Sequence, residues 1–268
     1  MRQAPGVPDM VASNDGVFIS YESRGDGKPA LVFVHGWSCD RGYWAAQLDW
    51  FADAYQVVAV DLAGHGESGT ERQVWTVQAF GEDVAAVADH LGLDRIVLIG
   101  HSMGGDVIVD AARLLPGTVD ALIMVDTYKQ LAVPRTNEEI RRLVGSFHLD
   151  FKSETRNFVG KLFLPGSNPQ IVERVVEDMS SAPPDIALAA LEASFANDSR
   201  LPSVLQDLNL PVVAINPDTP PTNEKSMQRY GVEVVLVPDV GHFLMMEKPG
   251  QFNRVLTSVL ENLNRASA

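Results

Sequence analysis

The sequence predicts an α/β protein in which a mostly parallel central sheet is flanked by helices. Two patterns support this class: short, nearly continuous apolar runs, and helix-periodic segments that lie between them. Runs that are apolar throughout are typical of strands buried on both faces, as in a parallel sheet. A third pattern, a long helix-rich stretch without a strand signal, indicates an insertion into this alternation.

The first half of the chain alternates between strand and helix signals. Val17–Tyr21 alternates polar and apolar residues, as a half-buried strand does. An apolar stripe from Phe80 to Leu91 has the i, i+4, i+7, i+11 spacing of one helix face. The strand signals that are almost fully apolar are Ala30–Val34, Val57–Val60, Ile96–Ile99 and Ala121–Val125.

Helix signals alone follow Val125. Thr136, with Glu139 three residues later, has the signature of a capping box ahead of an apolar stripe. Asn168-Pro169 is typical of an N-cap followed by the first helical residue. We therefore expect the residues from about 130 to 207 to be helical.

Strand signals return at Val212–Ile215 and Val234–Val237, and an amphipathic helix closes the chain. The sequence thus predicts a core domain of residues 1–126 and 208–268. Residues 127–207 are expected to form a helical insertion within it.

Charge and composition exclude several function classes. The chain has 21 Lys and Arg against 35 Asp and Glu, a net charge of −14, which argues against nucleic-acid partners and anionic membranes. No apolar run approaches the roughly 18 residues of a membrane span, and the first residues, MRQAPGVPDMVAS, lack the apolar stretch of a signal peptide. A single cysteine, Cys39, excludes an intrachain disulfide and a cysteine-ligated metal cluster. We expect a soluble, cytoplasmic protein, either a monomer or a homodimer.

The motif Gly100-His101-Ser102-Met103-Gly104 lies between a strand signal and a helix-like segment. A G-x-S-x-G turn in this context holds the serine in a strained backbone conformation and exposes its Oγ above the sheet. The glycines are required because a Cβ would collide with the tightly turned backbone. Ser102 is therefore the candidate nucleophile.

Acyl transfer by a serine requires two N–H donors aimed at the developing oxyanion. The Met103 N–H, at the start of the following helix, is one candidate, since the helix dipole favours an anion there. The Trp37 N–H, in the loop after Ala30–Val34, is the other, and its ring can wall the pocket.

The base and the acid of a catalytic triad are expected at the carboxyl ends of strands. His242 follows the last strand signal and precedes the final helix, which makes it the best candidate for the base. Asp126 and Asp218 each stand at a strand end, and either preserves the chain order Ser, Asp, His. We favour Asp126, because Asn216-Pro217 offers no glycine turn to swing Asp218 toward the histidine.

Four segments together resemble the α/β-hydrolase superfamily. They are HGW at 35–37, DLAGHGES at 61–68, GHSMG at 100–104 and PDVGHFLMMEKP at 238–249. The resemblance implies the α/β-hydrolase fold, with residues 127–207 as the helical cap, and is closest to the serine carboxylesterase-like group. An acid directly at the end of the earlier strand, at Asp126, resembles some dehalogenases and the coelenterazine luciferases.

Departures from other branches of the superfamily narrow the chemistry. Haloalkane dehalogenases and epoxide hydrolases carry Asp where this chain has Ser102, and HGGG-type lipases have a longer glycine run than HGW. The expected function is cleavage of small to medium carboxylic esters through an acyl-enzyme, with neither metal nor organic cofactor. Lactonase, amidase, perhydrolase or carbon–carbon bond hydrolase activity on the same triad remains open. A slow-turnover ligand-binding receptor, which the strigolactone receptors exemplify, is the alternative from another class.

Overall fold

The computed structural model describes residues 9–131, 133–197 and 200–266; the first eight residues of the segment examined for a signal peptide lie outside them. Within these residues, eight strands form one sheet in the order β1-β2-β4-β3-β5-β6-β7-β8. The β1/β2 and β2/β4 pairs are antiparallel and all other pairs are parallel. The strands are β1 (Asp9–Ala12), β2 (Phe18–Arg24), β3 (Ala30–Val34), β4 (Val57–Val60), β5 (Ile96–His101), β6 (Val119–Val125), β7 (Val212–Pro217) and β8 (Val232–Val237).

The apolar runs form the middle of this sheet. Every residue of β3, β4 and β5 is buried, as expected for strands covered on both faces. The observed bounds of β3 and β4 coincide with the two runs Ala30–Val34 and Val57–Val60. The structure adds β1, an edge strand with mostly exposed residues that carries no apolar pattern.

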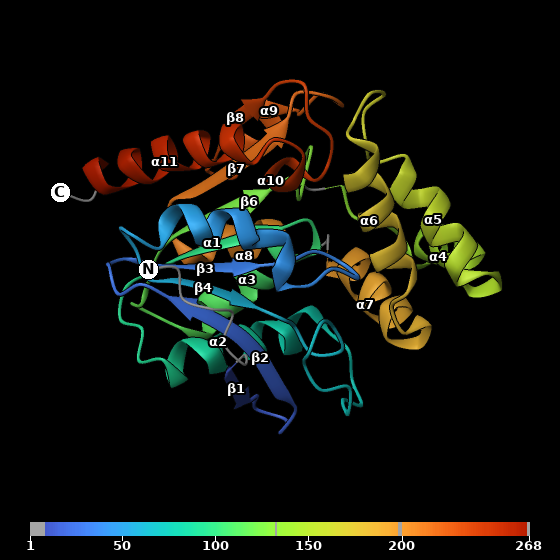
Figure 1. Cartoon of the computed structure of the whole chain (residues 1–268), viewed down its shortest axis with the longest axis horizontal. Helices are drawn as coiled ribbons and strands as arrows, with labels where there is room; N and C mark the ends of the chain where they lie inside the picture. The colour runs from blue at the N-terminus through green and yellow to red at the C-terminus, as the bar shows by residue number, and fades with distance from the viewer. Residues whose placement is uncertain (1–8, 132, 198–199, 267–268) are drawn as a thin grey trace.

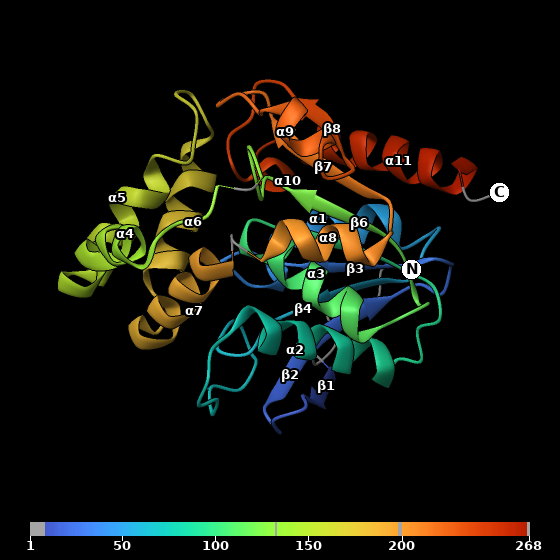
Figure 2. The same cartoon turned by 180° about the vertical axis from the view of Figure 1, so that it is seen from behind.

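Helices cover both faces of the sheet. In Figure 1, α1 and α11 lie on the near face, and Figure 2 shows α2, α3 and α8 on the opposite face. The helices of these layers are α1 (Ala45–Phe51), α2 (Val77–His90), α3 (Met103–Leu114), α8 (Leu201–Leu208) and α11 (Pro249–Ala266). Shorter helical turns are η1 (Arg41–Trp44), α9 (Glu224–Gln228) and α10 (Leu244–Glu247).

Four helices lie beside the layered core, at the right of Figure 1. The capping box of Thr136 and Glu139 is formed, and the Asn168 side chain caps α6 with Pro169 in its first turn. The structure adds α5, which begins directly after α4 because the Asp150 side chain accepts a hydrogen bond from Ser153 N. These helices are α4 (Asn137–Leu149), α5 (Phe151–Gly160), α6 (Pro169–Ser180) and α7 (Pro184–Asn197).

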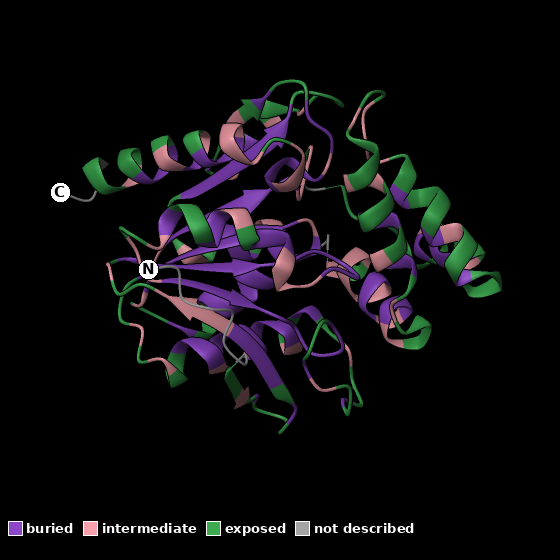
Figure 3. Cartoon of the chain, in the orientation of Figure 1, coloured by how far each residue is buried: buried purple, intermediate pink, exposed green. Residues whose placement is uncertain are grey.

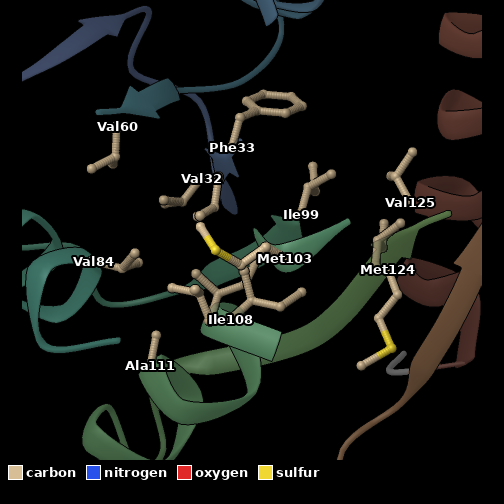
Figure 4. Packing of buried hydrophobic residues seen from close by; sticks show 14 of the residues in the cluster. Val32, Phe33, Val60, Val84, Ile99, Met103, Ile108, Ala111, Met124 and Val125 are labelled. Atoms are coloured by element: carbon tan, nitrogen blue, oxygen red, sulfur yellow. The ribbon is translucent and has the colours of Figure 1, made fainter. Parts of the chain in front are cut away.

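The core includes an apolar layer between the sheet and α3 and another on the face that α1 and α11 cover. Figure 3 shows the middle strands of the sheet buried, and Figure 4 shows core side chains, among them Met103 and Ile108 of α3 with Val32 of β3. Burying each such side chain contributes about 1.5–3 kcal/mol. The apolar layer between the sheet and α3 anchors the start of that helix, which directly follows Ser102. Among the described helices, none is both long enough and apolar enough to cross a membrane.

Candidate active site

Ser102 lies in a sharp turn between β5 and α3. Its backbone has φ 52° and ψ −121°, a conformation that costs free energy for any residue with a side chain. The turn depends on its glycines. A Cβ on Gly100 would lie 2.2 Å from the carbonyl oxygen of Gly104, and a Cβ on Gly104 would lie 2.5 Å from that of His35. The chain thus forms the strained turn that the GHSMG motif predicts, with Ser102 half-buried.

The strand register places Ser102 and Asp126 side by side at one edge of the sheet. His101 of β5 pairs with Val125 of β6, and Val125 pairs with Ile215 of β7. The two backbones stay bonded one residue further, with Ser102 N donating to Val125 O at 2.9 Å and Asp126 N to Ile215 O at 3.0 Å. Asp126 then leaves the strand at φ 44°.

Asp126, rather than Asp218, contacts His242. The distance from His242 Nδ1 to Asp126 Oδ2 is 2.7 Å, and the Asp126 side chain is only 8% exposed. Asp218 is exposed at the end of β7. Because a carboxylate only accepts, this contact puts the proton on Nδ1 and leaves Nε2 free to act as a base.

A hydrogen bond from His242 and the charge of Lys129 hold the Asp126 carboxyl ionised. Burial by itself raises the pKa of Asp126, but the hydrogen bond from His242 and the ammonium of Lys129 outweigh it, so this pKa lies below its ordinary value. Lys129 Nζ lies 2.9 Å from Asp126 Oδ1.

His242 is held by its own loop. Its backbone N donates a hydrogen bond of 2.9 Å to the carbonyl oxygen of Leu162, a residue that follows α5. Its carbonyl oxygen accepts from His101 Nε2 at 2.9 Å, so this nitrogen carries the His101 proton. Burial, with His242 close by, lowers the pKa of His101 to about 3. His101 is therefore a neutral buried support of the loop.

Two adjoining cavities meet at Ser102. The smaller has a volume of about 140 Å³ and contains Ser102, His242, Trp37 and Met103. The larger, about 550 Å³, shares Ser102 and Met103 and adds charged side chains. Further apolar residues of the smaller cavity are Cys39, Phe158, Leu162, Met179, Leu191, Phe195 and Phe243. Charged residues of the larger cavity are Asp106, Lys129, Arg135 and Glu139.

The two candidate oxyanion donors border the smaller cavity. Met103 is the first residue of α3, where backbone N–H groups have no partner within the helix. Trp37 lies inside a turn closed by Cys39 N donating to Gly36 O at 3.2 Å, and this bond does not use the Trp37 N–H. Both residues line the cavity that contains Ser102.

The Trp37 ring is fixed by the inserted helices. Its Nε1 donates to the carbonyl oxygen of Ala187 on α7, 2.6 Å away. Phe147, Phe151 and Phe158 meet the ring edge-on, with centroids 5.9, 6.1 and 6.2 Å away. The ring thus joins the loop after β3 to α4, α5 and α7, a contact that the sequence did not predict.

Residues outside the proposed triad have structural partners. In the segment 61–68, Asp61 accepts hydrogen bonds from Arg41 N at 2.7 Å and Glu67 N at 3.0 Å, so this carboxylate braces the turn. His148 lies in α4 and contacts Glu192 at the surface, 3.1 Å away. Within the described part of the chain, no group of three His, Cys, Asp or Glu residues is placed to hold a metal ion.

A profile of the alpha/beta hydrolase family matches residues 31–255. The chain therefore belongs to the alpha/beta hydrolase family, which its mostly parallel eight-stranded sheet also supports.

Its relatives include a lactonase and esterases. The 3-oxoadipate enol-lactonase 2 of Acinetobacter baylyi is 26% identical over 265 residues, 96% of this chain and 97% of that protein. The pimeloyl-[acyl-carrier protein] methyl ester esterase of Methylococcus capsulatus is 29% identical over 209 residues, 75% of this chain and 78% of that protein. Among solved structures, a thermophilic esterase from Thermogutta terrifontis superposes with a TM-score of 0.82 at 26% identity, covering 96% of this chain and 99% of that one.

Proposed function

We propose that this alpha/beta hydrolase is a serine carboxylesterase acting through an acyl-enzyme. The observation that carries the proposal is the 2.7 Å contact between His242 Nδ1 and Asp126 Oδ2, in a loop that shares a cavity with Ser102 on its strained turn. Esterases and a lactonase among the relatives support the same reaction class. Ser102 is the nucleophile, His242 the base and Asp126 the acid.

The mechanism needs no reactant other than the ester and water, and His242 carries out the proton transfers. His242 Nε2 takes the proton of Ser102 Oγ as Oγ attacks the ester carbonyl carbon. The N–H groups of Trp37 and Met103 hold the oxyanion of the tetrahedral intermediate. His242 returns the proton to the leaving alcohol as the C–O bond breaks. The same histidine then takes a proton from a water that attacks the acyl carbon, and it gives this proton to Ser102 Oγ as the acyl-Ser102 bond breaks and the carboxylic acid leaves.

The two cavities indicate the shape of the ester. The smaller one, about 140 Å³ and lined by apolar side chains, suits a short alkyl or acyl group. The larger one, about 550 Å³, is lined by both apolar side chains and charged or hydroxyl groups, and suits a group of mixed character. We therefore infer an ester with one short apolar side and one larger, partly polar side.

Residues 127–207 act as the helical cap in this proposal. Phe158 of α5, Met179 of α6 and Leu191 of α7 line the smaller cavity and so supply its apolar wall. Within the same range, α8 packs on α3 of the core layer, so the covering part is α4–α7.

A panel of nitrophenyl esters with acyl chains of rising length tests this function, with Ser102→Ala as the matched variant. We expect turnover on the short esters, and an activity about 10⁴–10⁶-fold lower in the variant. Variant activity within tenfold of the wild type would overturn the mechanism. A single slow turnover per protein, without steady-state hydrolysis, would instead favour the receptor function.

A lactone substrate is the second candidate, favoured by the enol-lactonase relative that covers 96% of this chain. The same nucleophile opens a lactone ring, but the leaving alcohol stays attached to the acyl group. Parallel assays on a γ-lactone and on the open-chain ester of equal size decide between the two. A kcat/KM at least tenfold higher for the lactone would assign the protein to lactones.

A further inference from the structure

The Asp126 carboxylate has a second partner besides His242. His242 occupies Oδ2 at 2.7 Å, and Lys129 Nζ occupies Oδ1 at 2.9 Å. The two oxygens are thus engaged separately, in a site where the Asp126 side chain is 8% and the Lys129 side chain 26% exposed. Removal of water at this depth makes the Lys129–Asp126 attraction stronger than that of a surface pair.

Lys129 is fixed from the neighbouring strand. Its Nζ also donates to the carbonyl oxygen of Pro217, 3.1 Å away at the end of β7. Its backbone carbonyl accepts from Asn223 N at 2.7 Å. The preceding carbonyl, that of Tyr128, accepts from the buried Asn216 side chain at 2.8 Å. The end of β7 therefore serves to anchor a lysine against the acid of β6.

We propose that Lys129 is a positioning residue for the reaction: it fixes the Asp126 carboxylate through Oδ1 and offsets part of its negative charge. The inference rests on the proposed roles of Ser102, His242 and Asp126. A carboxylate favours the protonated, inactive form of the histidine beside it. A cation on the far oxygen weakens that effect, and the pH dependence of the reaction reports such a change in charge.

The other groups around His242 do not duplicate this charge. His101, at the end of β5, has its ring centroid 4.5 Å from that of His242 and is neutral because burial lowers its pKa to about 3. Glu247 of α10 accepts from Phe243 N at 3.2 Å and from Ser167 Oγ at 2.8 Å, and its negative charge acts in the opposite direction to Lys129. Among the described residues, Lys129 is thus the cation that directly contacts the Asp126–His242 pair.

The test is the pH profile of kcat/KM on nitrophenyl acetate for the wild type, Lys129→Met and Lys129→Arg. Methionine keeps the length of the side chain and removes the charge, whereas arginine keeps the charge. We expect the acidic limb of the Lys129→Met profile to move up by about 0.5–1 pH unit, a loss of about 3–10-fold on that limb, with a smaller change on the plateau. Lys129→Arg should return the limb most of the way to its wild-type position.

Controls separate this proposal from its alternatives. Lys28→Met, at an exposed pair with Asp94, removes the same charge far from the site and should leave the profile unmoved. A purely structural Lys129 would lower Tm and the plateau without moving the limb, which would refute the proposal. The proposal would also be refuted if Lys129→Met raised KM only for an ester that bears a carboxylate, because Lys129 would then bind the substrate. If Ser102→Ala remains active, the proposed function fails as well; if only the limb stays unmoved, the Lys129 inference alone fails.

Discussion

Replacing Asp126 by asparagine changes one atom at the centre of the proposed site. The asparagine keeps the volume of the aspartate, so the loop after β6 should keep its shape. Its amide can place an NH₂ group toward His242 Nδ1, which then becomes the unprotonated nitrogen, and Nε2 carries the proton. The base would be in the wrong tautomer for taking the proton of Ser102.

The size of the effect follows from the contact and its burial. The side chain is 8% exposed and 2.7 Å from His242 Nδ1, so water cannot restore the lost acceptor. We expect kcat to fall by about 10²–10⁴-fold, as for loss of a triad carboxylate. Asp218→Asn is the matched control, because that side chain is exposed at the end of β7. Its activity should stay within about tenfold of the wild type.

Both variants are assayed on one short nitrophenyl ester, with circular dichroism and Tm to establish that each is folded. A folded Asp126→Asn variant with near wild-type kcat would refute the reasoning. The reverse pattern, with Asp218→Asn the inactive variant, would assign the acid to β7 and leave the other proposed roles intact.

Three further predictions concern the cavity, the core and pH. Met179→Ala enlarges the smaller cavity and should raise the ratio of kcat/KM for a hexanoate ester to that for an acetate ester. Leu149 on α4 is 89% exposed, so Leu149→Ala should leave this ratio unchanged. Equal ratios in the two variants would contradict the cap proposal. Arg72→Met leaves the buried Asp83 without its 2.5 Å partner and should lower the free energy of unfolding by about 3–5 kcal/mol in urea titrations, against less than about 1 kcal/mol for Lys28→Met. Burial lowers the pKa of His35 to about 4 and that of His65 and His101 to about 3. Below the ordinary histidine pKa of 6.5 the unfolded chain therefore binds more protons than the folded chain. The urea concentration at the unfolding midpoint should be lower at roughly pH 5 than at about pH 7.5, and an unchanged or higher midpoint at the lower pH would contradict this.

Strand positions could be read from the sequence where burial is complete. Ala30–Val34 and Val57–Val60 lie in the middle of the sheet, and full burial on both faces leaves only apolar residues there. The edge strand β1 has only one half-buried residue, Val11, so it leaves no such pattern. The boundary between α4 and α5 was not predicted, because only Asp150 separates the two helices and no glycine or proline marks it.

Some parts of the candidate site could also be predicted from the sequence, whereas others could not. Ser102 and the loop of His242 depend on local turns, which glycines and strand ends indicate in the sequence. The choice of Asp126 followed from the backbone limits of Asn216-Pro217. The contact between Lys129 and Asp126 could not be predicted. Asp126 leaves its strand at a positive φ, so the spacing of three residues does not tell whether the two side chains point the same way. The Trp37 bond to Ala187 O joins residues 150 positions apart, and no local pattern encodes it.

Covalent labelling of the serine is the most direct test of the central claim. A fluorophosphonate reacts with a serine only when a neighbouring base activates it and an oxyanion site holds the phosphoryl oxygen. We expect one adduct per chain by intact mass, mapped to Ser102 by peptide mass spectrometry, together with complete loss of esterase activity. Label on another residue, or full activity after stoichiometric labelling of Ser102, would contradict the account.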